Sequence, residues 1–318
     1  MSFYQFTPLY QERVWGGRAL AARLGRALPG TGPIGESWEI VDRPEAQSVA
    51  AAGGTHEGRT LRELISAHSA EVMGPNWAPG RRFPILVKWL DCRERLSLQV
   101  HPPADVATRL GGEPKTENWF IAHAEPGAGV LAGLQPGVDA ARFRAALADN
   151  TAESLVVRHG THAGDSILIR SGVMHAIDSG NLVLEIQQNS DTTYRCYDWG
   201  RVGLDGRPRQ LHIEQSLACL SANTAPSPQI IHATATDTVL ADCAEFRLRR
   251  FRLAAGESLH FKAREQPRIL SVVEGRLAVN GGRPLGAGDN VLLPYAGNFA
   301  FAATIGCTVL ITENFNHA

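Results

Sequence analysis

One short turn-and-strand pattern occurs twice in the sequence, and this repetition constrains the fold more than any other feature. The first copy is GDSILIRSG at residues 164–172, and the second is GDNVLLPYAG at residues 288–297. A Gly-Asp turn, a short apolar strand and a second glycine turn are typical of a jelly-roll hairpin. The first copy continues to His175, whereas the second has Asn298 and Phe299 in that place. The repetition predicts two jelly rolls, of which the first carries chemistry and the second is structural.

Short apolar or alternating runs bounded by turn residues dominate the rest of the chain. Many short strands with glycine and proline turns indicate a sandwich or a closed barrel. The predicted strands are 84–90, 96–100, 118–122, 166–169, 182–186, 246–253, 268–273, 290–293 and 307–311. The predicted helices are 60–73, which begins with Thr60 and Glu63 in capping-box spacing, 139–148 and 211–220. The expected fold class is all-β with a few helices.

The length of the chain and one turn-rich linker predict two domains. The 318 residues are enough for two hydrophobic cores. The linker, ANTAPSP at residues 222–228, follows the third predicted helix. We therefore expect a catalytic domain at residues 1–222, with N-terminal strands and helices, and a metal-free jelly-roll domain at residues 223–318.

The overall composition excludes several classes of partner. The net charge of −1 provides no basic field for nucleic acid or for an anionic membrane, and no apolar run reaches the length of a membrane span. The N-terminal residues lack the basic start and apolar core of a secretory signal. The five cysteines are widely spaced and form no CxxC pair, which is typical of reduced thiols. A cytoplasmic location is therefore expected.

Four side chains have the chemistry and spacing of a divalent-metal site. Gln99 and His101 alternate with Val100 at the end of a predicted strand, so they point to the same face. Glu117 lies ahead of the next strand, and His175 lies in the following hairpin. An amide oxygen, two imidazoles and a carboxylate suit zinc, with iron and manganese as competitors. Because an amide is a weak donor, a further position could remain for water or a substrate oxygen.

Several charged residues near this quartet are candidates for substrate contacts. In a cavity Arg195 could bind a phosphate or stabilise an oxyanion, and on the surface it would form an ordinary ion pair with Asp191 or a neighbour. Lys88 lies inside the apolar run FPILVKWL, so it faces either solvent from an edge strand or a polar cavity. Lys115 precedes Glu117 by two residues and is a third candidate cation. The sequence contains no glycine-rich phosphate loop, GxSxG elbow or dinucleotide fingerprint.

Six segments together resemble the type I mannose-6-phosphate isomerases (phosphomannose isomerases), specifically their short bacterial branch. The combination of QxH, KxE, a later histidine and SDxxxR is specific to this family. The resemblance runs in family order over residues 5–220, and the later part matches only in pattern. The matching segments are RVWGG at 13–17, IGESWEI at 34–40, LSLQVHP at 96–102, KTENWF at 115–120, HAIDSG at 175–180 and EIQQNSDTTYRCYDWGR at 185–201.

The resemblance implies a fold, a cofactor and an activity. It implies two cupin-type jelly rolls (a bicupin), the C-terminal one degenerate, in a cytosolic enzyme. We expect the protein to be a monomer or homodimer. It implies interconversion of mannose 6-phosphate and fructose 6-phosphate, with one Zn²⁺ per chain. The implied ligands are Gln99, His101, Glu117 and His175, the implied catalytic residue is Arg195, and Lys88 and Lys115 would line the substrate pocket. One departure is Arg170, which replaces the usual proline of the hairpin turn and bears on the choice of substrate.

The reaction implied would transfer a proton between C1 and C2 through a cis-enediol or enediolate. The candidate base is Asp191, and a metal-bound hydroxide is the alternative. Three other functions remain open. They are isomerisation or epimerisation of another sugar or sugar phosphate, a cupin oxygenase reaction, and non-catalytic sugar binding on the same fold.

Overall fold

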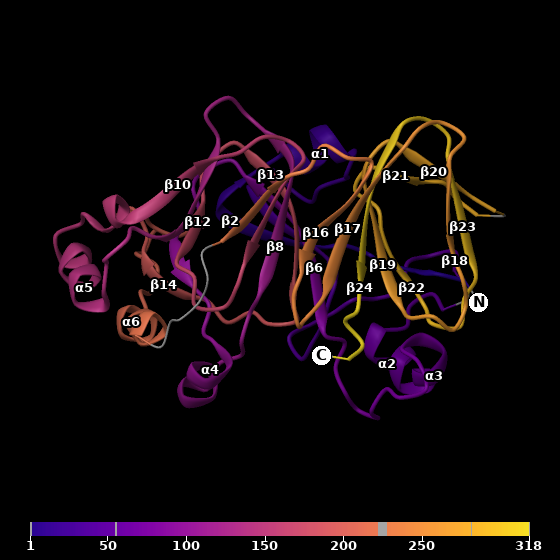
Figure 1. The fold of residues 1–318 in the computed structure, drawn as a ribbon, viewed down its shortest axis with the longest axis horizontal. Coiled ribbons are helices and arrows are strands. Elements are labelled where there is room, and N and C mark those ends of the chain that lie inside the picture. The colour runs from indigo at the N-terminus through magenta and orange to yellow at the C-terminus, as the bar shows by residue number, and fades with distance from the viewer. Residues whose placement is uncertain (1, 55, 222–227, 281, 318) are drawn as a thin grey trace. The chain divides into compact units, whose positions relative to one another are not determined.

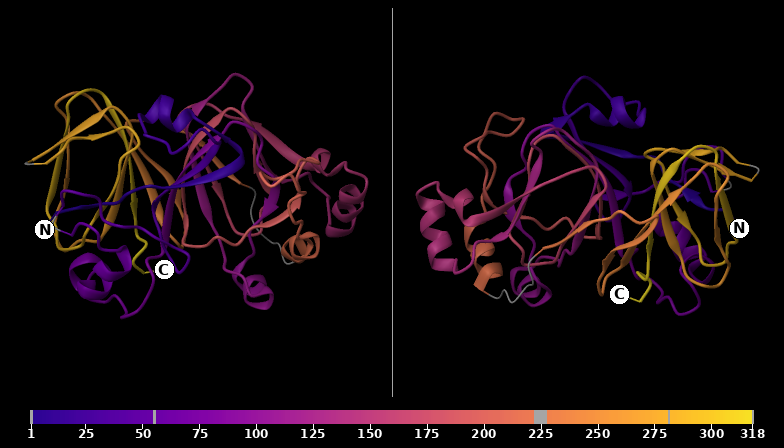
Figure 2. Two further views of the ribbon diagram at one scale, coloured as in Figure 1. Left: turned by 180° about the vertical axis from the view of Figure 1, so that it is seen from behind. Right: turned by 45° about the horizontal axis from the view of Figure 1, so that its top comes forward.

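The computed structural model describes residues 2–54, 56–221, 228–280 and 282–317, and it is mostly β-structure with a few helices (Figures 1 and 2). These residues form two compact units. The first comprises residues 1–9, 38–87 and 233–318, and the second comprises residues 10–37 and 88–232. The predicted boundary at 222–228 lies, except for Pro228, outside the described residues. The division into domains at 1–222 and 223–318 stays a prediction.

Two sheets build the second unit. Their strand orders are β10-β9-β12-β7-β14 and β15-β11-β8-β13-β6-β3-β2. Parts of β2, β3 and β6 belong to segments of the first unit. The five-stranded sheet consists of β10 (Val156–Gly160), β9 (Gly129–Leu134), β12 (His175–Ile177), β7 (Leu98–Val100) and β14 (Tyr194–Tyr197). The seven-stranded sheet consists of β15 (Gln229–His232), β11 (Asp165–Ile169), β8 (Glu117–Ala124), β13 (Asn181–Gln188), β6 (Ile85–Cys92), β3 (Ile34–Ile40) and β2 (Leu9–Gly17).

Alternation along the strands divides the apolar side chains of the second unit between two cores. Ile177 of β12 packs with residues of the seven-stranded sheet such as Trp119 and Val183. Ala176, one residue earlier, belongs to the other core, together with Phe143. Side chains of α5 and α6 form part of this second core. Because successive side chains of a strand point to opposite faces, the residues of β7 and β12 that do not contact these helices face the seven-stranded sheet. The helical elements of this unit are α1 (Ala19–Leu24), α4 (Ala104–Leu110), α5 (Ala140–Ala148), the 3₁₀ helix Ala152–Leu155 and α6 (Ile213–Ser221).

The first unit also has two larger sheets, with a core of aliphatic and phenylalanine side chains between them. The six-stranded sheet consists of β1 (Tyr4–Gln5), β22 (Asn290–Leu293), β19 (Arg268–Glu274), β24 (Cys307–Glu313), β17 (Arg247–Leu253) and β16 (Asp237–Asp242). The four-stranded sheet consists of β18 (Ser258–Phe261), β23 (Phe299–Ala303), β20 (Arg276–Val279) and β21 (Leu285–Gly286). The remaining elements are the pair β4 (Asp42–Arg43) and β5 (Ala46–Gln47), and the helices α2 (Leu61–Ala67) and α3 (Ser69–Val72).

The predicted elements are confirmed with one exception, and further elements, such as α1, α4 and β2, were not predicted. Each of the nine predicted strands overlaps an observed strand, and α5 and α6 occupy most of the second and third predicted helices. The predicted helix at 60–73 is wrong as one element, because it breaks at His68, whose backbone (φ −138°, ψ 41°) is not helical. The helix α4 was not expected after two prolines. Pro103 occupies its N-cap, where the missing N–H of proline costs nothing.

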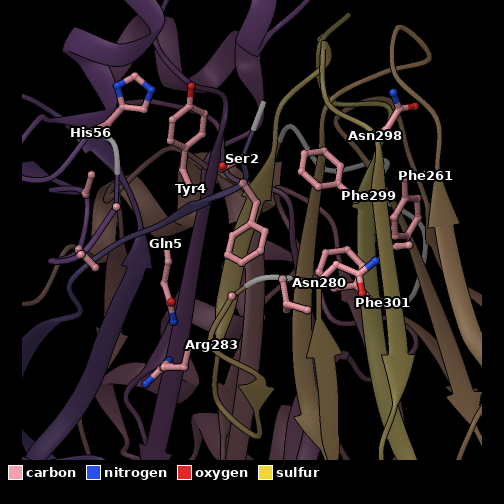
Figure 3. Close-up of a pocket in the computed structure, with 18 of the residues that line it drawn as sticks. Ser2, Tyr4, Gln5, His56, Phe261, Asn280, Arg283, Asn298, Phe299 and Phe301 are labelled. Atoms are coloured by element: carbon pink, nitrogen blue, oxygen red, sulfur yellow. The ribbon is translucent and has the colours of Figure 1, made fainter.

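A cavity of about 900 Å³ lies within the first unit (Figure 3). Phenylalanine rings such as Phe261, Phe299 and Phe301 form part of its wall, and polar side chains such as Gln5 and Arg283 border it. None of the residues predicted to bind metal or substrate lines this cavity.

Two expectations about the chain as a whole can be compared with the structure. All five cysteines are free thiols, as the spacing predicted. Over the described ranges, every helix is too short or too polar to cross a membrane.

Candidate metal centre

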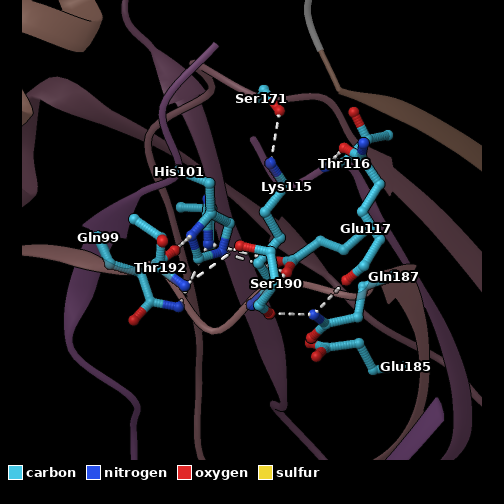
Figure 4. A network of polar contacts seen from close by, with 12 residues as sticks. Gln99, His101, Lys115, Thr116, Glu117, Ser171, Glu185, Gln187, Ser190 and Thr192 are labelled. Carbon is cyan, nitrogen blue, oxygen red and sulfur yellow. Dashed lines mark hydrogen bonds and ion pairs between the residues drawn. The ribbon is translucent and has the colours of Figure 1, made fainter. Parts of the chain in front are cut away.

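Three of the four predicted metal ligands converge in the second unit. Two of them, His101 and Glu117, are labelled in Figure 4. His101 follows β7, Glu117 begins β8 and His175 begins β12. One ligand atom from each residue lies within 4.8 Å of the others, and all three side chains are fully buried. Among the described histidine, cysteine, aspartate and glutamate residues, this is the one group of three or more that meets this criterion.

Backbone carbonyl groups determine which edge of each imidazole faces the cluster. Nδ1 of His101 lies 2.9 Å from the carbonyl oxygen of Thr192, and Nδ1 of His175 lies 2.8 Å from that of Val173. Because a carbonyl oxygen only accepts, each Nδ1 carries the proton and donates it. Each Nε2 then presents a lone pair. These two nitrogens lie 3.2 Å and 3.4 Å from the two carboxylate oxygens of Glu117.

The pKa values of His101, His175 and Glu117 leave the nitrogen and oxygen atoms of this cluster unprotonated where they face one another. Burial lowers the pKa of His101 to about 3 and also lowers the pKa of His175, so both rings are neutral near pH 7. Burial raises the pKa of Glu117, but the charge of Lys115 opposes it, and the net pKa lies well below its usual value. The ammonium Nζ of Lys115 lies 3.0 Å from Glu117 Oε2. A carboxylate and two neutral imidazoles therefore face one another.

These atoms fit a divalent cation. Nε2 of His101 and Oε1 of Glu117 are buried and accept no hydrogen bond from the described residues, and Oε2 of Glu117 has the ion pair with Lys115. Buried acceptors without a partner are destabilising, and acceptors that face one another also repel. A cation among them would receive a lone pair from one ligand atom of each residue. Hydrogen bonds from Nδ1 to a carbonyl are a common support of metal-binding imidazoles. His101, Glu117 and His175 are therefore residues that could hold a metal ion.

Gln99 lies beside this cluster with its amide nitrogen toward it. Gln99 is the cross-strand partner of His175, and its Nε2 lies 3.3 Å from His175 Nε2. Its Oε1 accepts a hydrogen bond of 3.3 Å from the hydroxyl of Ser97. The structure thus brings the fourth predicted ligand to the cluster, but its amide oxygen points to Ser97.

The predicted cation Lys88 points into the buried interior and not to solvent. Its side chain is 4% exposed, and its Nζ lies 3.8 Å from Glu185 Oε1 and 4.0 Å from Asp191 Oδ1. Asp191 itself is about half exposed. The reading in which Lys88 faces solvent from an edge strand is therefore wrong.

Arg195 reaches the cluster only through intermediate side chains. It lies in β14, directly opposite Gln99 of β7. Its Nε donates to Ser97 Oγ at 3.3 Å, and its NH1 group donates to the carbonyl oxygen of Gln210 at 2.9 Å. Hydrogen bonds therefore connect Arg195, through Ser97 and Gln99, to His175.

Glu185 is a buried acid of this site that the sequence analysis missed. It lies in β13, and burial, followed by the charge of Glu117, raises its pKa to about 7. A raised pKa at a buried charged cluster is typical of functional sites. The signal was present in the sequence, because Glu185 interrupts the apolar run LVLEI as Lys88 interrupts FPILVKWL.

Comparison with known proteins points to one family. The sequence profile described as "Phosphomannose isomerase type I, catalytic domain" matches residues 3–113. "Mannose-6-phosphate isomerase ManA" of Bacillus subtilis (strain 168) is 34% identical over 314 residues, which cover 96% of this chain and 97% of the relative. The "Mannose-6-phosphate isomerase" of Streptococcus mutans is 34% identical over 292 residues and 89% of each chain.

A solved structure agrees with these relatives over the whole chain. The crystal structure of the mannose 6-phosphate isomerase from Bacillus subtilis matches with a TM-score of 0.86 and 31% sequence identity, covering 98% of this chain and 100% of that chain. The resemblance drawn from the sequence motifs is thereby confirmed. The chain belongs to the type I phosphomannose isomerases, the family of the mannose-6-phosphate isomerases.

Proposed function

We propose that this chain interconverts mannose 6-phosphate and fructose 6-phosphate with the help of one zinc ion. The observation that carries the proposal is the buried cluster of His101, Glu117 and His175, whose lone pairs face one another without a proton between them. Relatives that share a third of their residues over nearly the whole chain are named for this reaction.

Zinc suits the donor set better than the competing metals. Two imidazoles and a carboxylate are common zinc donors, and an amide oxygen from Gln99 would complete four ligands. A half-turn of the Gln99 amide would exchange its oxygen for the nitrogen that now faces His175. When bound, a divalent cation supplies Lewis-acid stabilisation of negative charge on the sugar oxygens.

Three cationic side chains would bind the substrate and stabilise the negative charge that develops on it. Lys88 and Lys115 are proposed to bind the sugar phosphate, since both ammonium groups are held among carboxylates in the buried site. Arg195 is proposed as the catalytic arginine, which stabilises the enediolate by charge-assisted hydrogen bonds. The hydrogen bond from Arg195 to Ser97 and the cross-strand pairing of Arg195 with Gln99 hold it near the cluster and support this role.

Two carboxylates are candidates for the base that moves the proton between C1 and C2. Asp191 is our first candidate, because its side chain is accessible to a substrate and lies 4.0 Å from Lys88. Glu185 is the second, because a pKa of about 7 is matched to proton transfer at neutral pH. Asp191→Asn and Glu185→Gln distinguish them, since replacement of the base should lower kcat by at least about 100-fold.

The finer description of the fold belongs to the same proposal. We assign the two units to cupin-type jelly rolls. The predicted division, with catalysis in residues 1–222 and a degenerate, metal-free roll in residues 223–318, differs from these units because residues 1–9 and 38–87 cluster with 233–318. The paired sheets and the two Gly-Asp strands β11 and β22 support this assignment. We further propose a cytoplasmic monomer or homodimer.

A coupled assay tests the function. Conversion of mannose 6-phosphate to fructose 6-phosphate should occur, stop after treatment with a chelator and return on addition of zinc. Absence of turnover with zinc would reject the proposal. A panel of aldoses with and without a 6-phosphate separates this reaction from that of another sugar isomerase, and oxygen uptake would indicate an oxygenase.

A further inference from the structure

We infer that Trp119 is a positioning residue that couples the metal cluster to the buried pair of Glu185 and Lys88. The inference rests on the proposed function, because it concerns side chains that would act on the same substrate. Trp119 lies in β8 two residues after Glu117, so alternation places both on one face of the sheet. Its side chain is 1% exposed.

The indole N–H holds one oxygen of the Glu185 carboxylate. Trp119 Nε1 donates a hydrogen bond of 3.0 Å to Glu185 Oε2, and the two residues are direct cross-strand partners in β8 and β13. The other oxygen, Oε1, lies 3.8 Å from Nζ of Lys88. An indole N–H is a neutral donor that cannot accept. It therefore fixes the orientation of Glu185 and leaves charge compensation to Lys88.

The ring of the same tryptophan contacts the metal cluster. Its centroid lies 5.4 Å from that of His175, with the ring planes at 69° in an edge-to-face arrangement. The proton on His175 Nδ1 is already held by the carbonyl oxygen of Val173. The contact with the indole edge restricts rotation of the His175 imidazole about its side-chain bonds. One side chain thus orients a predicted metal ligand and a buried acid together.

The chemistry of the acceptor separates this role from ordinary core packing. A buried tryptophan needs some partner for its N–H, and a backbone carbonyl is sufficient. Trp199 has such a partner, because its Nε1 donates to the carbonyl oxygen of Leu96 at 2.7 Å. The acceptor of Trp119 is instead a buried carboxylate beside Lys88. Trp199 therefore provides a matched control.

The test compares Trp119→Phe, Glu185→Gln, their double variant and the control Trp199→Phe, each loaded with zinc. Trp119→Phe keeps an aromatic ring and loses the N–H, so we expect kcat to fall about 10- to 100-fold while KM and bound zinc change little. Trp199→Phe should keep kcat within about twofold. Because Trp119 acts through Glu185, the double variant should be no slower than the slower single variant.

Three results would overturn the inference. They are an unchanged kcat in Trp119→Phe, an equal loss in Trp199→Phe, and losses that multiply in the double variant. If Trp119→Phe fails to fold, benzothienylalanine at position 119 replaces the N–H with sulfur in a ring of the same shape, and the same loss of kcat is expected.

The contact between Trp119 and His175 can be tested by measuring bound zinc, without measuring turnover. Trp119→Ala removes the ring edge, so elemental analysis after dialysis should find less zinc than in the wild type or in Trp119→Phe. Equal zinc in all three would refute this part of the inference. If the wild type shows no isomerase activity, the proposed function fails, and this measurement still decides whether Trp119 supports the cluster.

Discussion

At the scale of single residues, the site depends on the carboxylate of Glu117 and on two neutral imidazoles, His101 and His175, that face it. Glu117 keeps its charge because Lys115 lies 3.0 Å from it, and both histidines keep their lone pairs because backbone carbonyls hold their Nδ1 protons. Neither histidine takes up a second proton near neutral pH, since burial lowers the pKa of both. The arrangement is unfavourable until a cation enters it.

Replacement of Arg195 by alanine should separate catalysis from metal binding. The guanidinium contacts Ser97 and the carbonyl of Gln210 and makes no direct contact with Glu117 or the two histidines. We expect kcat to fall by about 100- to 1,000-fold, as for the loss of one charge-stabilising donor, with the metal retained. Steady-state kinetics and elemental analysis measure the two effects. Loss of metal in proportion to activity would instead show that Arg195 is structural.

Acid should destabilise the metal-free protein through His101. Its pKa is about 3 in the folded chain and about 6.5 unfolded, so between these values the unfolded chain binds the extra proton. The free energy of unfolding therefore falls as the pH falls from 6.5 toward 3. Between about pH 7 and pH 5 the contribution of His101 is on the order of 2 kcal/mol.

Comparison with a variant isolates that contribution. Glu185 acts in the opposite direction, because its pKa is raised from 4.5 to about 7 and the folded chain binds the extra proton in that window. The measurement is thus the difference between chelated wild type and chelated His101→Gln in urea unfolding at several pH values. Stability curves that stay parallel would show that His101 does not titrate as described.

At the scale of elements, the site is built by period-two alternation on short strands. Gln99 and His175 point between the sheets because their neighbours, such as Val100 and Ala176, pack against the helices. The sequence therefore predicted Gln99 and His101 on one face. It could not predict that Thr192 and Val173 would orient the imidazoles, because those contacts are made by backbone carbonyls and leave no mark in the residue types.

Contacts between segments that are far apart in the chain could not be predicted from the residue pattern either. Apolar or alternating runs predicted nine strands, since burial on one or both faces of a strand leaves a clear signal in the sequence. The contribution of residues 38–87 to the same unit as 233–318 could not be predicted, because it depends on contacts between segments far apart in the chain. The break at His68 was missed because apolar spacing continues through it.

The start of α2 gives a prediction at the scale of one element. The side chain of Thr60 accepts a hydrogen bond from the backbone of Glu63, whose carboxylate accepts one from the backbone N–H of Thr60. Thr60→Ala should weaken this helix by about 1 kcal/mol, which accelerates exchange of its first amide hydrogens roughly fivefold. Thr60→Ser should preserve the wild-type rates. Equal acceleration in both variants would mean that the hydroxyl does not cap the helix.

At the scale of the whole molecule, the metal should act as a cross-link. Its predicted ligands come from β7, the start of β8 and the start of β12, which are far apart in sequence. Chelation should therefore lower the melting temperature, since zinc at about 100 times its Kd adds about 2.7 kcal/mol of stability. Calorimetry with and without chelator measures this, with His101→Ala as the insensitive control. An identical melting temperature in chelated and zinc-loaded wild type would contradict the expected cross-link.

The most direct test of the central claim is the position of the metal in a crystal of the zinc-loaded protein. Anomalous diffraction measured on both sides of the zinc absorption edge identifies the element and its site. We expect one peak per chain, about 2.0–2.2 Å from Nε2 of His101, Nε2 of His175 and an oxygen of Glu117. A zinc peak elsewhere in the chain, or none at these three side chains, would contradict it.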